Sequence, residues 1–187
     1  MKQLILLLFL FSTCNIMAQR KINGVNNLYA KDTTFYENGY AYQCDVREGS
    51  MHITLYNKKN KYTYVDQTFK ATNLPVSMDE NRYSGPHLEP DNWTKPKTFS
   101  IINNAFSAEE KARIKGNLLG ILLYINSDTG KIMEVEYQFV GWVQFASIPV
   151  SVYRKIETGL KANVWFVPTK EGKRRNYILR CWMHEVE

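Results

Sequence analysis

The chain has 187 residues, of which 44% are hydrophobic and 22% are charged, a composition that excludes an intrinsically disordered chain and indicates a globular protein. An aromatic share of 13%, with twelve tyrosines, favours β-strands. The formal net charge of +6 indicates anionic partners and leaves their chemical class open.

Residues 1–18 follow the order of a bacterial secretory signal. Lys2 precedes an apolar run over 4–11, and smaller residues lead from there to Ala18. This run is far shorter than the roughly 20 residues that a membrane-spanning helix needs. We therefore expect cleavage after Ala18 and a mature chain that is periplasmic or secreted. A lipoprotein anchored at Cys14 is the alternative.

Export narrows the expected partners. Nucleic acid is not expected outside the cytoplasm, so the positive charge points to an envelope protein or peptide, or to an anionic surface glycan or lipid. No segment after residue 18 is long and apolar enough to form a membrane helix. The mature chain is therefore predicted to lack a membrane span.

Residues 19–69 are predicted to form an N-terminal β-meander. Apolar residues alternate in "YAYQCDV" (40–46) and in "MHITLY" (51–56), and the aromatic stretch "YTYVDQTF" (62–69) supplies a third strand. The polar segments between these runs are short, which favours tight reversals of the chain.

Residues 70–106 have a different character. They contain four prolines and scattered charges, without a helical or strand period. We interpret this stretch as a long Pro-bearing connector without regular structure. In the alternative interpretation the loop carries the function of the protein, with Tyr83, His87 and Trp93 as the exposed groups of an enzyme or inhibitor site.

Residues 107–187 are predicted to form a C-terminal ββαβ unit. A capping box, in which Glu110 follows Ser107 by three residues, begins a short leading helix. Two strands follow, 119–126 and 131–139, and the turn "NSDTGK" between them supplies Asp and Gly where a reversal needs special backbone angles.

A longer helix and a final strand complete this unit. Apolar residues recur at helical spacing over 148–163, and Pro149 suits the first turn of that helix. A right-handed crossover then places 176–186 antiparallel beside 119–126, so the expected strand order is 131–139, 119–126, 176–186. The predicted fold class is α+β, an antiparallel sheet with this ββαβ unit and an N-terminal β-meander that covers its second face.

Seven positions of the C-terminal unit follow a pattern of Gly-bearing turn, strand, helix, aromatic step and second Gly-bearing turn: Gly130, Ile132, Val135, Trp165, Phe166, Pro168 and Gly172. The pattern resembles the C-terminal domain of TonB-type envelope proteins, which implies the fold rather than an activity. Energy transducers of that family keep a membrane helix and a Pro-rich spanning linker. This chain departs from that pattern, since it has a cleavable signal and a shorter Pro-bearing connector. As a whole, the chain resembles a small exported family of unknown function from gut-type gram-negative bacteria.

The sequence contains no catalytic or cofactor-binding pattern. The three histidines, His52, His87 and His184, are far apart and lack metal-ligand spacing. A nucleophile elbow, a phosphate-binding glycine loop and a Cys-x-x-Cys motif are also missing from the sequence. We therefore expect no metal, no cofactor and no enzymatic activity.

Two cysteines remain in the expected mature chain, Cys44 and Cys181, and both lie in strand-like runs. An oxidising compartment permits a disulfide between them. Two free buried thiols on different strands are the other interpretation. The sequence leaves the choice open, because the bridge depends on the distance between the two Cα atoms.

The final strand is the leading candidate for a binding site. An outermost strand carries unpaired backbone groups that can accept an extended peptide, and a basic turn beside it would steer an acidic segment toward it. The alternatives are that Arg180, His184 and Glu185 guard this edge or that the meander pairs with it. The predicted function is a non-catalytic binding or adaptor protein of the envelope, with these candidate residues near the edge: Lys170, Lys173, Arg174, Arg175, Tyr177 and Leu179.

Overall fold

The computed structural model describes residues 20–22, 25–78 and 85–187, so the predicted signal over 1–18 lies outside the described residues. The strands of this part are β1 (Arg20–Ile22), β2 (Val25–Asn27), β3 (Thr33–Glu37), β4 (Tyr40–Arg47), β5 (His52–Asn57), β6 (Leu118–Ile125), β7 (Ile132–Val140) and β8 (Ile178–Glu185). Its α-helices are α1 (Thr94–Asn103), α2 (Ala108–Ile114) and α3 (Val150–Asn163), and its 3-10 turns are η1 (Val76–Met78), η2 (Gln144–Ser147) and η3 (Gly172–Arg174).

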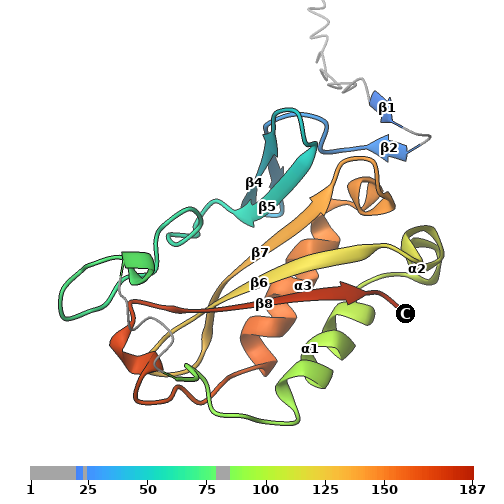
Figure 1. The fold of residues 1–187 in the computed structure, drawn as a ribbon. Coiled ribbons are helices and arrows are strands. Elements are labelled where there is room, and N and C mark those ends of the chain that lie inside the picture. The colour runs from blue at the N-terminus through green and yellow to red at the C-terminus, as the bar shows by residue number, and fades with distance from the viewer. Residues whose placement is uncertain (1–19, 23–24, 79–84) are drawn as a thin grey trace, which may run out of the picture.

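Six of these strands form one antiparallel sheet in the order β3-β4-β5-β7-β6-β8, while β1 and β2 pair with each other. The α+β class is confirmed, and so is the predicted order of the last three strands. Helices α1 and α3 lie on the same face of the sheet (Figure 1). Helix α3 connects β7 to β8, and the crossover places β8 at the edge of the sheet.

The core lies between α3 and the sheet. Apolar residues recur at helical spacing along α3, and the inward-facing residues of β6 and β7 pack against them. Tyr137 of β7 donates its hydroxyl hydrogen bond to the Tyr153 carbonyl oxygen at 2.7 Å, and the Tyr153 hydroxyl donates to Phe145 O at 2.9 Å. The fully buried side chains of this layer include Ile121, Leu123, Val135, Tyr137, Tyr153, Ile156 and Leu160.

The meander has two of its predicted strands, β4 and β5, but the third was assigned to the wrong segment. The third strand is β3, which pairs with β4 through a two-residue turn at Asn38 and Gly39. Both turn residues have positive φ, 47° and 78°, as a type I′ hairpin requires. The Asn-Gly pair is therefore the sequence signal that marks this strand.

Residues 62–69, the predicted third strand, instead cross the face of the sheet that lies away from α3. Backbone N–H groups of Lys61 and Tyr62 donate to the Glu134 carboxylate of β7 at 2.6 and 2.9 Å. The Tyr62 ring then stacks on Tyr124 of β6. The aromatic residues of this segment thus cover part of the second face, the role that was wrongly predicted for the meander, which extends the same sheet beyond β7.

The stretch 70–106, predicted to lack regular structure, contains helix α1. Asp91 organises the start of this helix, because its carboxylate accepts hydrogen bonds from the backbone N–H groups of Trp93 and Thr94 and from the Thr94 hydroxyl. Pro96 lies in the first turn, where a missing N–H costs nothing. These two residues are a helix-start signal that the proline content of the stretch obscured.

The predicted capping box at the start of α2 is confirmed. The Ser107 hydroxyl accepts from Glu110 N at 3.2 Å, and the Glu110 carboxylate accepts from Ser107 N at 2.8 Å. We expect Ser107→Ala to lower the free energy of unfolding by about 1 kcal/mol, because a helix N–H loses its acceptor. Urea unfolding measures the change, and Ser107→Asp, which keeps an acceptor, should remain near the parent; equal stability of both variants would contradict this role.

Candidate functional site

Strand β8 lies at one end of the sheet, and β6 is its one strand partner within the described residues. The pairing with β6 runs along the whole of β8, from Ile178 opposite Ile125 to Glu185 opposite Leu118. The meander pairs with β7 and does not reach β8, which removes one of the two alternatives for this edge. The opposite side of β8 therefore carries the backbone groups of an edge strand.

The helix-facing side of β8 is anchored by aromatic contacts. Trp182 meets Phe99 of α1 edge to face, and His184 stacks on the same ring with centroids 4.0 Å apart. The His184 Nε2 lies 2.7 Å from Asn103 Oδ1 at the end of α1. Burial lowers the pKa of the His184 imidazole. His184 is therefore a packed residue rather than a solvated guard of the edge.

The face of β8 that points away from the helices is apolar and exposed. Leu179 is 43% exposed and Met183 58%, and Cys181 between them is exposed as well. Leu118, at the near end of β6, adds another side chain that is 51% exposed. Because successive residues of a strand alternate between faces, Leu179, Cys181 and Met183 form one row, which we call the outer row of β8.

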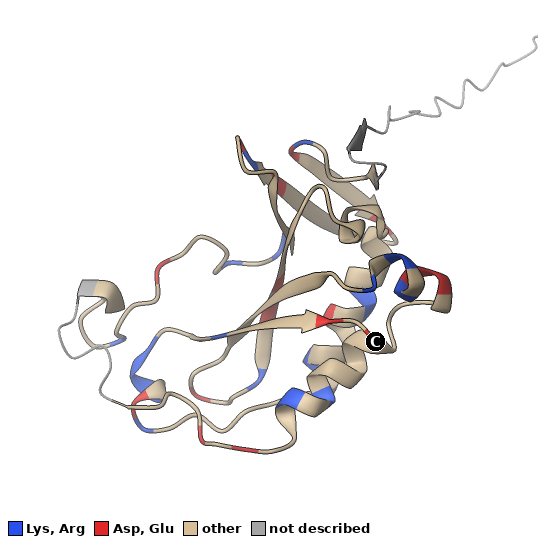
Figure 2. Cartoon of the chain, turned by 45° about the vertical axis from the view of Figure 1, so that its right-hand side comes forward, with Lys and Arg blue, Asp and Glu red and all other residues tan. Residues whose placement is uncertain are grey.

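The turn before β8 carries the predicted positive charge only in part. Lys170, Lys173 and Arg174 are exposed, and Arg174 pairs with Glu171 at 2.9 Å. Figure 2 shows Lys and Arg gathered at this turn and an acidic residue at the tip of β8. The prediction that the basic side chains of this turn are available to a partner was wrong for Arg175, which is 1% exposed and donates to Gln67 Oε1 at 2.9 Å.

Tyr177 was also wrongly expected to be available to a partner. Its side chain is buried, and its hydroxyl donates to the Val65 carbonyl oxygen at 2.6 Å. The ring packs on Tyr62 and Tyr124. Tyr177 therefore fixes the covering segment to the sheet, and Leu179 is the first residue of the last strand that is exposed on the outer row.

Of the three loop residues predicted for an enzyme or inhibitor site, Tyr83 lies outside the described residues. His87 reaches the start of β8, where it lines a pocket of about 270 Å³ together with Leu179 and Arg180. Burial and the nearby Arg175 guanidinium lower the pKa of the His87 imidazole. Trp93 lies elsewhere and packs against the Trp165 ring, with centroids 4.6 Å apart. The structure thus brings His87, but not Trp93, to the candidate edge.

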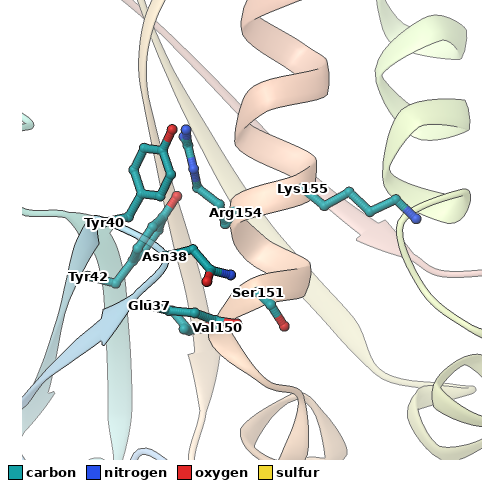
Figure 3. Close-up of a pocket in the computed structure, with 8 residues that line it drawn as sticks. All are labelled: Glu37, Asn38, Tyr40, Tyr42, Val150, Ser151, Arg154 and Lys155. Atoms are coloured by element: carbon teal, nitrogen blue, oxygen red, sulfur yellow. The ribbon is translucent and has the colours of Figure 1, made fainter.

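A second pocket, of about 230 Å³, lies between the meander and α3 and was not predicted from the sequence. Figure 3 shows Tyr40 and Tyr42 side by side on β4 with Arg154 of α3 alongside them. The Arg154 guanidinium lies 3.3 Å from the Tyr40 ring centroid. Lys155 points away toward α1, where its ammonium donates to the carbonyl oxygen of Asn104 at 2.9 Å.

Glu157 lies behind this pocket and is only 1% exposed. Its carboxylate accepts hydrogen bonds from the Tyr42 hydroxyl, from the Asn57 amide at 3.3 Å and from the Lys161 ammonium at 2.5 Å. The Arg154 guanidinium lies 3.5 Å away. Burial, followed by the negative charge of Glu157, raises the pKa of Tyr42. We call these five residues the Glu157 cluster; because its carboxylate is already satisfied from several sides, its evident role is to join α3 to the meander.

The signal for this cluster was present in the sequence. Glu157 falls on the apolar stripe of α3 with Tyr153 and Leu160, and an acidic residue on such a stripe requires buried partners. Its partners on β4 and β5 follow only from the pairing of the sheet with the helix.

The two cysteines are free and far apart in the sheet. Cys44 is buried on β4, Cys181 is exposed on β8, and three strands separate them. At about 4.8 Å per strand step, the two Cα atoms are roughly 19 Å apart, well beyond the reach of a disulfide. A bridge within one chain is thereby ruled out, while the prediction that both thiols are buried was wrong for Cys181. Burial raises the pKa of the Cys44 thiol to about 12.

No group of three or more His, Cys, Asp or Glu side chains that could hold a metal occurs in the described residues. Among the helices of this same part, none has both the length and the hydrophobicity that crossing a membrane requires.

The chain is similar to proteins of one family. Residues 26–182 match the profile of DUF5043, described as a domain of unknown function. A crystal structure of a DUF5043 family protein from Bacteroides uniformis superposes on the chain with a TM-score of 0.77 and 37% sequence identity, covering 84% of this chain and 93% of that chain. No curated protein matches the chain.

Proposed function

We propose that this chain, which belongs to the DUF5043 family of unknown function, is a non-catalytic binding protein that adds an extended, acidic segment of a partner to the edge of β8. The observation that carries this proposal is the position of β8 at the end of the sheet, paired with β6 alone among the described residues. Backbone N–H and C=O groups on its other side would pair with the added strand.

The side chains around this edge support the choice of partner. Lys170 and Lys173 lie exposed in the turn before β8, and Arg180 is exposed within the strand. A partner strand would therefore meet positive charge at one end and the apolar outer row along its length. An extended segment that alternates apolar and acidic residues fits both features, because alternate side chains of a strand share a face.

The cellular setting remains a prediction from the sequence. Signal cleavage after Ala18 would make the chain periplasmic or secreted, and a lipid anchor at Cys14 is the alternative. The resemblance to TonB-type domains favours the bacterial envelope. A protein of the envelope that offers an extended segment with acidic residues is then the expected partner. The same positive charge is compatible with an anionic glycan or lipid, and the experiment below separates these from a strand partner, because neither forms a backbone ladder.

We expect hydrogen exchange to detect the added strand on the expected mature chain, residues 19–187. Alternate amides over 178–185 should exchange fast in the free protein, since only those facing β6 are bonded. A ten-residue peptide that alternates valine and glutamate should slow them, and its affinity should fall as salt rises. Uniform protection of this segment in the free, monomeric protein would overturn the proposal.

Charge variants test the basic turn. The double variant Lys170→Glu/Lys173→Glu should weaken binding of the valine–glutamate peptide by about three- to tenfold, as expected for two exposed charge contacts. Lys31→Glu/Arg47→Glu, two exposed changes toward the opposite edge of the sheet that alter the net charge by the same amount, serve as the control and should leave the affinity unchanged. Equal losses in both variants would show that the turn does not contact the peptide.

A further inference from the structure

Strand β8 is complementary to its own sequence when it is reversed. Its first end follows the basic turn with Lys173 and Arg174, and its last end carries Glu185, with Glu187 two residues beyond (Figure 2). Two antiparallel copies of the strand would bring the basic end of each beside the acidic end of the other.

We propose that the segment added to β8 is β8 of a second copy of the chain, so that two six-stranded sheets join edge to edge about a two-fold axis. The acidic residues of the added segment are then Glu185 and Glu187 at its end. This inference rests on the proposed function, since it uses the same edge. The contact is isologous, because the same surface serves both copies.

The two-fold axis restricts the register. When an antiparallel strand pairs with its own copy symmetrically, one residue must lie opposite itself. The strand has eight residues, so the two central choices are Cys181 and Trp182.

Centring the pair on Trp182 would place the Arg180 guanidinium opposite the His184 imidazole, and the apolar Leu179 side chain opposite the Glu185 carboxylate. Neither pair is complementary. Centring it on Cys181 places Leu179 opposite Met183 and Arg180 opposite Trp182. Both of the latter pairs are favourable, one apolar and one between a guanidinium and an indole ring. The register centred on Cys181 is therefore the one that the side chains favour.

This register also explains the outer row. Exposed edge strands are commonly blunted by Lys, Pro or inward charges, but the outer row of β8 consists of Leu179, Cys181 and Met183. His184 and Trp182 on the other side pack against Phe99. In the paired form, Leu179 and Met183 of each copy would cover each other and lose much of their exposure.

Cys181 supplies a natural reporter. Opposed residues of an antiparallel pair have Cα atoms about 4.5 or 5.5 Å apart, and both values lie within the range of a disulfide. Mild oxidation of the mature chain by oxygen with copper-phenanthroline should therefore join two copies, as two thiols lose two protons and two electrons to oxygen and form one S–S bond. Cys44 is fully buried and should not react.

The experiment compares variants of the mature chain under this oxidation. The parent and Cys44→Ser should give a covalent dimer at least tenfold faster than Tyr36→Cys/Cys181→Ser, whose thiol lies on the opposite edge strand, where Tyr36 is 80% exposed. In a Cys181→Ser background, Leu179→Cys mixed with Met183→Cys should form the heterodimer, while each alone should react slowly.

Sedimentation under reducing conditions should show a monomer–dimer equilibrium. Over the same range of concentrations, the protection of the 178–185 amides from hydrogen exchange should rise with the fraction of dimer. A chain that stays monomeric, or a dimer whose Cys181 thiols do not react faster than the Tyr36→Cys control, would overturn the second-copy inference. If the monomer still binds the valine–glutamate peptide at β8, the proposed function survives this result; if it does not, both fall.

Discussion

Replacing Glu157 with alanine is expected to lower the free energy of unfolding by about 3 kcal/mol, which corresponds to a melting temperature lower by about 6–12 °C in a chain of this size. The carboxylate is 1% exposed and accepts hydrogen bonds from Tyr42, Asn57 and Lys161. Its removal would leave the Tyr42 hydroxyl and the Asn57 amide buried without their shared acceptor.

The expected loss lies at the low end of the range for broken buried ion pairs, because the cations can relax. Lys161 and Arg154 have side chains that are 32% and 25% exposed, so both can turn toward water. The variant Glu157→Gln keeps the shape and one acceptor oxygen, and we expect an intermediate loss.

Thermal and urea unfolding of the mature chain measure these losses. The matched control is Glu48→Ala, which removes an exposed carboxylate from the β4–β5 turn and should change stability by no more than about 0.5 kcal/mol. A Glu157→Ala variant as stable as Glu48→Ala would show that the Glu157 cluster does not join α3 to the meander.

Gly130→Ala is expected to destabilise the chain by about 3–5 kcal/mol. Gly130 has a φ of +74°, and a Cβ at this position would lie 1.7 Å from the Phe166 carbonyl oxygen. The Phe166 N–H also donates to the Gly130 carbonyl oxygen at 2.9 Å, so this approach of two backbones ties the β6–β7 turn to the segment after α3. The cost has two parts, a left-handed backbone and a steric clash that forces the segments apart.

Gly49→Ala separates these two parts. Gly49 has a nearly identical φ of +77°, but an added Cβ would meet nothing within 4 Å. We therefore expect a loss of about 1–2 kcal/mol from the backbone alone. The difference between the two variants in urea unfolding reports the clash, and similar losses for both would contradict the close approach at Phe166.

Local signals in the sequence were sufficient for several elements. The capping box of Ser107 and Glu110, the apolar stripe of α3 and the Gly130 turn between β6 and β7 were all read from short segments and are present in the structure. Each depends on residues within one or two turns of chain, so the neighbouring sequence contains the whole cause. The α+β class and the edge position of β8 followed from these elements and from the handedness of crossovers.

Only the tertiary structure decided which side chains of the predicted site remain at the surface. Arg175 and Tyr177 looked like surface groups of a basic hairpin, but long-range contacts with Gln67 and Val65 bury them. The sequence alone determined that the chain has an antiparallel sheet with an edge strand after a basic turn. The tertiary structure decided that residues 62–69 cover the sheet instead of joining it, because their best partners, such as Glu134, lie on strands far away in the sequence.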